Sequence, residues 1–384
     1  MKRTSSELDR LANNWVAELA QLSPSFATYV GIPGGEDRLD DHSPEHEARY
    51  HQARKTLLEK LSKISPVDAV DEVTLDALTA DLELSSEIYE AGLYRRDLNV
   101  IASPAQGIRD IFDLSPTSTE QDWVNLDSRM RQVSNALSGY RESLREGIAA
   151  GDTPARRQVE KVIEQVAQIT AEDGFFLKFA ATAKSGSGEL SSALQASLAQ
   201  AAQQATDSYA DFGAFLRDEL LAKASGVDAI GRERYALLSQ TFLGAKVDLD
   251  DTYEWGIAEL AKVIEEQEKV ADQIKPGATI LEAIAELERD PKRKLHGTDA
   301  LQAWMQQLSD QAVEKLSGTH FDIAEPLKRL ECLIAPTQHG GIYYTGPTDD
   351  FSRPGRMWWS VPPGVTEFDT WRETTTVYHE GVPG

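Results

Sequence analysis

The sequence is almost without cysteine and has no long apolar run. Cys332 is the only cysteine in 384 residues, which excludes an intrachain disulfide and a cysteine-rich zinc module. No stretch approaches the ~18 consecutive apolar residues that a membrane-spanning helix requires. The first residues, MKRTSSEL, include two basic side chains, but no apolar run of signal-peptide length follows them. We therefore expect a soluble, cytoplasmic protein.

Positive charge is also scarce. The chain has 39 lysine and arginine residues against 63 aspartate and glutamate residues, which gives a net charge of −24 and a pI near 4.7. Such a field repels phosphate backbones and anionic lipids, so we expect neither a nucleic-acid partner nor a membrane partner. The apolar fraction of 41% is ordinary, so whole-chain disorder is not expected. The length fits about two domains or one large helical architecture.

Residues 1–333 mostly have the apolar spacing of helices, and we expect them to form a helical body. Steps of three and four residues predict helices along three stripes. The longest stripe consists of Leu194, Leu198, Ala201, Ala205, Tyr209, Phe212, Leu216 and Leu220. The two shorter stripes are Tyr253, Ile257, Leu260 and Ile264, and Ile280, Leu281, Ile284 and Leu287.

Local signals place helix starts and breaks within this body. Thr4, Ser118 and Asp251 each stand three residues before a Glu or Gln, as a helix N-cap in a capping box does. Gly151–Pro154 and Lys184–Gly188 are rich in turn residues and predict breaks between helices. No fixed-period repeat supports a solenoid.

The sequence changes character in residues 334–384. Residues 340–347 are β-prone and bounded by Gly and Pro, and residues 358–361 form a second candidate strand between Pro-Gly segments. Together they predict a short β-hairpin attached to a mainly α-helical protein. A further helix is predicted from the stripe of Phe368, Trp371, Thr375 and Tyr378.

One cluster of candidate metal ligands lies near the N-terminus. His42, His46 and His51 surround Glu47, but His46 and His51 diverge by about 140° around a helix. His42 and His46 have the four-residue spacing of a zinc helix, but Pro44 stands between them where a helix would be starting. We interpret this segment as the surface of an N-terminal helix and not as a metal site.

A second candidate is the pair His379–Glu380. A His-Glu pair alone is a weak signal, but this one ends an amphipathic stretch that follows two strand-like segments. A strand edge beside a His-Glu helix can hold an extended peptide next to a zinc ion. In that reading His379 binds zinc, and Glu380 takes a proton from the zinc-bound water that attacks a carbonyl.

A third candidate is an aromatic and basic set around the predicted strands. Its members could direct a hydroxyl or guanidinium group at an oxyanion or a substrate carboxylate, or they could simply alternate between core and surface. Both readings stay open, although Tyr343 and Tyr344 must face opposite ways on a regular strand. The candidate substrate-binding residues are Tyr343, Tyr344, Arg353, Trp358 and Trp359, with Arg356 in the same segment.

The C-terminal motifs resemble a bacterial family called domain of unknown function 885. The resemblance depends on Tyr343-Tyr344-x-Gly-Pro-x-Asp-Asp-Phe-Ser-Arg-Pro-Gly355 and on Tyr378-His379-Glu380-Gly-Val-Pro-Gly384. It implies a large multi-helix, zincin-like architecture and the signature His-Glu-x-x-Pro-Gly-His-His. It also implies that His379 is the first zinc ligand, that Glu380 is the general base, and that a peptide is the substrate.

The sequence stops inside this signature, at Pro383-Gly384. We therefore expect a fragment or a shortened gene product that binds zinc weakly or not at all and has no peptidase activity by itself. The complete protein would be a zinc-dependent peptide hydrolase. One alternative is a catalytically silent helical scaffold of the same fold that binds a peptide or protein, and another is a helical regulator with an accidental His-Glu pair. The oligomeric state stays open.

Overall fold

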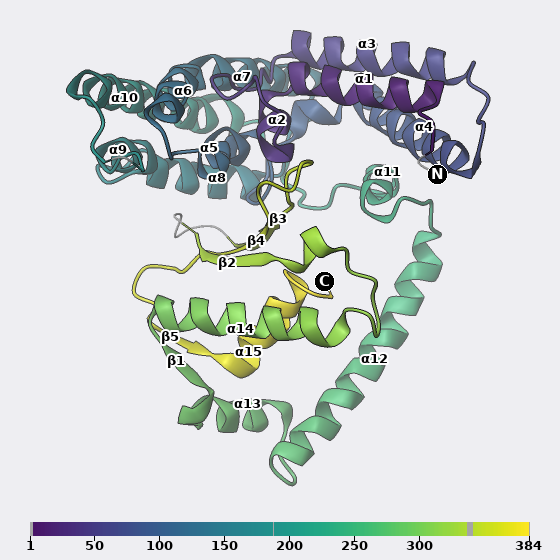
Figure 1. Cartoon of the computed structure of the whole chain (residues 1–384), viewed down its shortest axis with the longest axis vertical. Coiled ribbons are helices and arrows are strands. Elements are labelled where there is room, and N and C mark those ends of the chain that lie inside the picture. The colour runs from purple at the N-terminus through teal and green to yellow at the C-terminus, as the bar shows by residue number, and fades with distance from the viewer. Residues whose placement is uncertain (1–2, 187, 336–340, 384) are drawn as a thin grey trace. The chain divides into compact units, whose positions relative to one another are not determined.

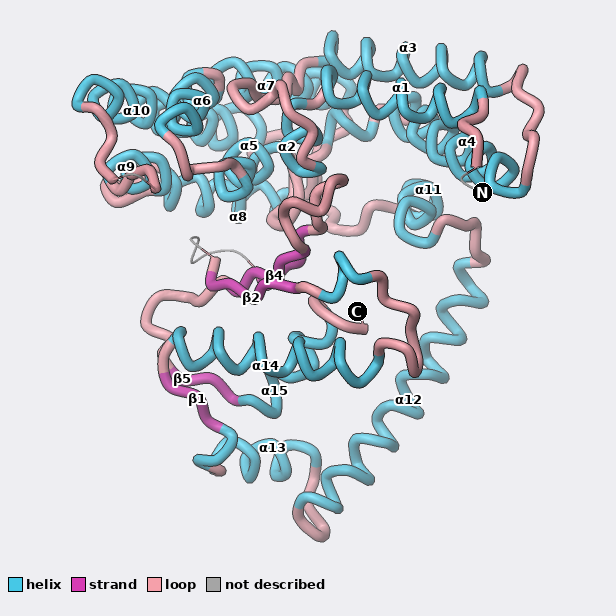
Figure 2. The backbone as a smooth tube through the Cα atoms, viewed as in Figure 1, coloured by secondary structure: helices cyan, strands magenta, loops and turns pink. Residues whose placement is uncertain are grey.

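The computed structural model describes residues 3–186, 188–335 and 341–383. It is mainly α-helical with small sheets near the C-terminus, as the sequence predicts (Figures 1 and 2). The chain divides into two compact units, Met1–Lys246 and Val247–Gly384. We call them the N-terminal unit and the C-terminal unit. The predicted boundary between residues 333 and 334 lies inside the C-terminal unit, at the end of a strand.

The N-terminal unit is built from helices alone. Figure 1 shows them packed side by side in the purple-to-teal part of the chain. They are α1 (Glu7–Leu22), α2 (Pro24–Val30), α3 (Pro44–Leu61), α4 (Ala69–Glu90), the 3₁₀ turn η1 (Leu93–Arg96), α5 (Pro104–Leu114), α6 (Glu120–Arg131), α7 (Val133–Ala150), α8 (Arg156–Ile169), α9 (Phe175–Ala181), α10 (Ser192–Phe215), the π turn η2 (Leu216–Leu220) and α11 (Arg232–Leu243).

The core of this unit forms around α10. All of the predicted stripe from Leu198 to Leu220 is buried, and α10 packs against α6, α7, α8 and α9. The stripe is continuous, but the helix changes from α to π at Leu216. The central helix therefore buries one long apolar face, and a second apolar cluster of Leu8, Trp15, Leu57, Leu61 and Leu82 lies between α1, α3 and α4.

The predicted helix starts are close to the observed ones but not correct. Ser6, and not Thr4, caps α1 in a capping box with Asp9, and Thr119, and not Ser118, caps α6 with Asp122. Asp248 caps the helix that was expected to start at Asp251. In each case another Ser, Thr or Asp lies within three residues, and the apolar face of the helix decides which one becomes the cap.

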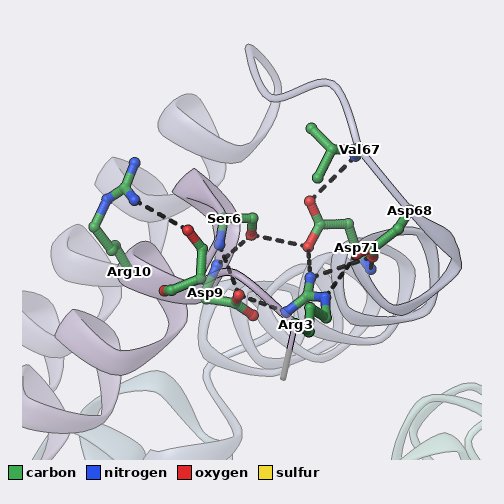
Figure 3. Close-up of polar contacts among 8 residues, drawn as sticks. Arg3, Ser6, Asp9, Arg10, Val67, Asp68 and Asp71 are labelled. Atoms are coloured by element: carbon green, nitrogen blue, oxygen red, sulfur yellow. Dashed lines mark hydrogen bonds and ion pairs between the residues drawn. The ribbon is translucent and has the colours of Figure 1, made fainter. Parts of the chain in front are cut away.

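Arg3 ties the starts of two helices together (Figure 3). Its guanidinium group bonds to Asp9 at the start of α1 and to Asp68 and Asp71 at the start of α4. The Ser6 hydroxyl donates a further hydrogen bond to Asp71 at 2.8 Å. The Asp71 side chain is only 2% exposed, so it depends on these partners for its charge balance.

The C-terminal unit combines helices with two small sheets. Figure 2 shows its strands in magenta, and α14 lies between the two sheets, with contacts to β1 and β2. Its elements are α12 (Leu249–Ile274), α13 (Ile280–Arg289), the 3₁₀ turn η3 (Pro291–Arg293), β1 (Lys294–His296), α14 (Thr298–Leu316), the 3₁₀ turn η4 (Glu325–Lys328), β2 (Leu330–Ile334), β3 (Ile342–Thr345), β4 (Gly355–Trp359), β5 (Glu367–Asp369) and α15 (Thr370–His379).

The predicted hairpin is confirmed, but it is part of a larger sheet. β3 and β4 pair antiparallel, with Tyr343 opposite Trp358 and Tyr344 opposite Met357. β4 also pairs in parallel with β2, so the strand order is β2-β4-β3. A second sheet pairs β1 with β5. The prediction missed β1, β2 and β5 because these short strands find their partners through distant parts of the chain.

The core of the C-terminal unit lies between α14 and one face of the three-stranded sheet. Leu301 and Met305 of α14 pack with Cys332, Met357 and Trp359 of the sheet. From α15 only Val377 is buried in this core. The predicted last helix is confirmed as α15, but its expected apolar stripe is not: Phe368 is buried in β5, and Trp371, Thr375 and Tyr378 are not buried.

Candidate functional site

His379 and Glu380 mark the end of the last helix. His379 is the final residue of α15, and the Glu380 N–H still donates to the Thr376 carbonyl at 2.9 Å. The backbone then passes very close to the sheet at Gly381. A Cβ there would lie 2.7 Å from the Val377 carbonyl oxygen and 3.2 Å from Met357 Cε. The collision with the Val377 carbonyl of α15 favours glycine at this position, and the chain passes beside Met357 of the sheet as it leaves the helix.

The two candidate side chains are not engaged in the fold. His379 is exposed and Glu380 is half-buried. Within the part of the chain that the structure describes, neither side chain makes a hydrogen bond or an ion pair. An imidazole and a carboxylate in this state can accept a metal ion, a proton or a substrate group.

Tyr343 and Trp358 lie together on the sheet face that points away from α14. Their rings stack with centroids 6.2 Å apart at an angle of 18°. Trp358 Nε1 also donates to the Thr345 hydroxyl at 3.0 Å. Strand alternation puts Met357, and with it the His-Glu segment, on the opposite face. These two aromatic residues therefore do not share a face with His379 and Glu380.

Tyr344 and Trp359 lie on the same face as Met357, but only Tyr344 reaches solvent. Trp359 is buried in the core, whereas Tyr344 is 44% exposed. The Tyr344 ring lies over Gly355, where any Cβ would collide with the tyrosine hydroxyl. Of the predicted substrate-binding residues on the strands, Tyr344 is the one that combines exposure with the face of the His-Glu segment.

Arg353 lies in the loop between β3 and β4. Its N–H donates to the Thr348 hydroxyl at 3.1 Å, and the Thr348 N–H donates back to the Arg353 carbonyl. Hydrogen bonds from Ser352 and Thr348 lower the pKa of the Asp350 carboxyl to about 2. The loop therefore has a defined conformation, and the neighbouring Arg356 is already paired with Glu331 at 2.9 Å.

The outer edge of β2 is covered by glutamine side chains, which the sequence analysis missed. Gln306 donates to the Leu330 carbonyl at 2.8 Å and accepts from the Cys332 N–H at 3.0 Å. Gln302 donates to the Cys332 carbonyl at 3.0 Å. The two amides occupy the backbone groups that a neighbouring strand would use. The spacing of Gln302 and Gln306, four residues apart on one helix, is the sequence pattern that could have predicted a covered strand edge.

A depression of about 620 Å³ borders this covered edge. Charged side chains from η4, β2 and α14 form much of its wall, together with Gln306 and Leu330. Neither His379 nor Glu380 lines it, although a Cβ at Gly381 would lie 3.4 Å from Leu330 Cδ2. The depression and the His-Glu segment therefore share Leu330 as a neighbour.

The histidines near the N-terminus belong to the packing of the N-terminal unit. His46 is buried, which corrects its assignment to a helix surface, and Arg49 bonds to its Nδ1 at 3.0 Å. The His42 ring packs edge-on against Tyr140, with centroids 6.3 Å apart. Burial lowers the pKa of both imidazoles. Among the described residues no group of three or more His, Cys, Asp or Glu side chains could hold a metal ion.

Fold and site together define a mainly helical protein with a His-Glu pair held against a three-stranded sheet. The chain matches the family described as "Bacterial protein of unknown function (DUF885)" over residues 24–384 and belongs to that family. No curated protein matches the chain.

Two solved structures show the same fold. One is a "putative lipoprotein" from Colwellia psychrerythraea, with 19% identity and a TM-score of 0.81. The other is a "putative lipoprotein of unknown function" from Shewanella oneidensis, with 16% identity and a TM-score of 0.62. The similarity covers 99% of this chain in both cases, and 72% and 71% of the respective relatives. In the described parts of this chain, no helix has both the length and the apolar character needed to cross a bilayer.

Proposed function

We propose that the chain forms most of a zinc-dependent peptide hydrolase with a zincin-like architecture. The observation that carries this proposal is the placement of His379 and Glu380, adjacent in sequence, accessible, unpartnered among the described residues and fixed by the close packing of Gly381.

The described residues do not by themselves fit a complete zinc site, because they contain no group of three candidate ligands. The proposal therefore follows the family signature His-Glu-x-x-Pro-Gly-His-His and assigns the other zinc ligands to residues that would follow Gly384. Zinc would polarise the scissile carbonyl and activate the attacking water. His379 would bind the metal through a neutral ring nitrogen, and Glu380 would accept a proton from the water.

Tyr344 is the residue that we propose for contact with the peptide. Its ring is exposed at the edge of β3 and lies on the sheet face against which Gly381 packs. A phenol there can donate a hydrogen bond to a substrate carbonyl or to a developing oxyanion. The role proposed for the other aromatic residues is structural: they would keep β3 and β4 in register. These residues are Tyr343, Trp358 and Trp359.

The test is a comparison of zinc content and peptide hydrolysis in the longest natural form of the protein. We expect about one zinc per chain and cleavage of a mixed peptide library. His379→Ala should lose zinc and activity, whereas Glu380→Gln should keep zinc and lose activity. His296→Ala, at an exposed histidine of β1, is the matched control and should keep both. Full zinc content in His379→Ala would refute the assignment, as would tight stoichiometric zinc binding by residues 1–384 alone.

The second candidate function is a catalytically silent scaffold of the same fold that binds a peptide or protein. It is favoured by the apolar side chains that α12 exposes. A longest natural form that binds peptides, holds no zinc and cleaves none would support the scaffold.

We propose a cytoplasmic location, with attachment to the cell envelope as the alternative. The cytoplasmic location is the expectation drawn from the sequence. The alternative comes from the two structural relatives, both described as putative lipoproteins. Fractionation of cells that express the longest natural form, followed by immunoblotting, distinguishes the two.

A further inference from the structure

The helix α12 exposes almost its entire length. Of its 26 residues, all of which the structure describes, only Ala271 is buried. Its principal contact is with α13, and Figure 1 shows the two helices meeting at the C-terminal end of α12. A free helix about 39 Å long is unusual, because most helices in proteins are stabilised by packing one face.

The exposed surface of α12 is an organised apolar face. Tyr253, Ile257, Leu260 and Ile264 follow one another at steps of four, three and four residues, which is the heptad spacing of a helix that packs on another helix, and Val263 and Val270 flank this stripe on one side. Their exposed fractions lie between 42% and 67%, a large apolar area for a surface helix. We call these residues the α12 apolar face: Tyr253, Ile257, Leu260, Val263, Ile264 and Val270.

The charges around this face have one sign. Glu254, Glu265 and Glu268 follow one border, and Glu259 and Glu266 follow the other. The helix carries eight acidic residues and two lysines. At 100° per residue both lysines fall on the side opposite the apolar face, where Lys262 pairs with Glu259 and Lys269 with Glu265. Within α12, all of whose residues are described, no positive charge borders the apolar face, although Lys275 follows directly after the helix.

We propose that the α12 apolar face binds an amphipathic helix of another protein, whose apolar stripe is flanked by lysine or arginine. The heptad spacing selects a helix as the occupant, and the acidic borders select basic flanks. A second copy of this chain would bring the same acidic borders together, and its net charge of −24 would add to the repulsion. An anionic membrane surface is disfavoured for the same reason. The proposal goes beyond the peptidase function and does not depend on zinc.

Three designed peptides test the proposal by fluorescence anisotropy with the 384-residue chain. The first has three heptads with Leu at the core positions and Lys at the flanking positions, the second has Glu in place of Lys, and the third has the composition of the first in scrambled order. We expect the Lys peptide to bind at least tenfold more tightly than the other two, and more weakly as salt is raised. Equal binding of the Lys and scrambled peptides would overturn the proposal, because it would show general attraction to an acidic protein.

Substitutions at exposed positions of α12 test whether the Lys peptide binds at the α12 apolar face. Leu260→Asp should weaken the Lys peptide at least tenfold, whereas Trp255→Asp, 65% exposed on the lysine side of the helix, should leave binding unchanged. The pair Glu254→Lys and Glu268→Lys should shift the preference toward the Glu peptide, and this result does not depend on the folding of Leu260→Asp. Unchanged preference in the charge-reversed protein would refute the acidic borders as the determinant.

Two further measurements exclude the other occupants. Sedimentation of the unliganded chain should show a monomer. If the chain self-associates and Leu260→Asp abolishes the self-association, the face belongs to a second copy and the proposal fails. The longest natural form should also bind the Lys peptide. If it does not bind while residues 1–384 do, the face is covered within the same polypeptide and the proposal fails.

Discussion

Gln306 and Cys332 face each other across the open edge of β2, and the side-chain oxygen of Gln306 accepts the Cys332 N–H at 3.0 Å. The same amide donates to the Leu330 carbonyl. A helix side chain thus substitutes for the strand that would otherwise extend the sheet. This relationship explains how a three-stranded sheet can end at β2 without exposing a template for pairing with another chain.

Removing this amide should destabilise the C-terminal unit and make the chain prone to aggregation. In Gln306→Ala the Cys332 N–H and the Leu330 carbonyl lose their partner, at a cost of about 1–3 kcal/mol in the free energy of unfolding. Urea denaturation measures the loss, and light scattering during heating measures the aggregation. The neighbouring Gln307 is exposed, so Gln307→Ala is the matched control and should behave as wild type. Equal stability of the two variants would show that water replaces the amide without cost.

Gly355→Ala should destabilise the sheet through Tyr344. The added methyl group would collide with the tyrosine hydroxyl, and such overpacking costs about 1–3 kcal/mol. In the Tyr344→Ala background the collision disappears, so Gly355→Ala should cost clearly less there. Chemical denaturation of the wild type, the two single variants and the double variant gives this coupling energy. Strictly additive effects would contradict the close packing of Tyr344 on Gly355.

The parts of the fold that local patterns determine could be predicted from the sequence. The stripe from Leu198 to Leu220 predicted the central helix because a 3.6-residue period specifies a buried face. The β3–β4 hairpin could be predicted because its strands are close in sequence. β2 was not predicted, because its strand partner begins at Gly355, more than twenty residues later, and its other edge is satisfied by α14. Periodicity also placed a helix at Tyr253–Ile264 but could not show that its apolar face is exposed.

For the candidate site, the sequence indicated residue types but not their arrangement. Strand alternation predicted that Tyr343 and Tyr344 face opposite ways, and the structure confirms it. The sequence could not show which of the two shares a face with His379, because that depends on where Gly381 meets Met357. The ligand and base roles of His379 and Glu380 stay predictions.

The Arg3 network should be a determinant of stability in the N-terminal unit. Arg3→Ala leaves the buried Asp71 carboxylate without its guanidinium partner and reduces the link between the starts of α1 and α4 to the hydrogen bond from Ser6 to Asp71 (Figure 3). We expect a lower Tm, and earlier amide hydrogen exchange in residues 7–22 and 69–90 than elsewhere in the unit. Arg10→Ala is the control, because Arg10 makes only one long bond of 3.4 Å, to the Ser5 carbonyl. A Tm as high as that of Arg10→Ala would exclude a structural role for Arg3.

Asp97 should make the stability of the N-terminal unit depend on pH. Desolvation of its carboxyl group raises the pKa to about 6, although the residue as a whole is exposed, so solvent screening makes the effect on stability smaller than the full shift implies. Burial raises the pKa of the nearby Glu47, and the charge of Asp97 adds to that effect. Because the pKa of Asp97 is higher in the folded state than in the unfolded state, the folded protein binds more protons between pH 4 and pH 6. Its contribution to stability is therefore complete below about pH 4 and is lost as pH rises through about 6.

Asp97→Asn removes this titration while keeping a neutral, polar side chain of the same shape. We expect its Tm to exceed that of the wild type at pH 7 and the two to converge as the pH falls below 4, where the wild-type carboxyl becomes protonated in both states. The exposed Asp211→Asn on α10 controls for the loss of one negative charge and should follow the wild-type curve at both pH values. A constant difference in Tm between Asp97→Asn and the wild type across this range would show that the pKa of Asp97 is the same in the folded and unfolded states.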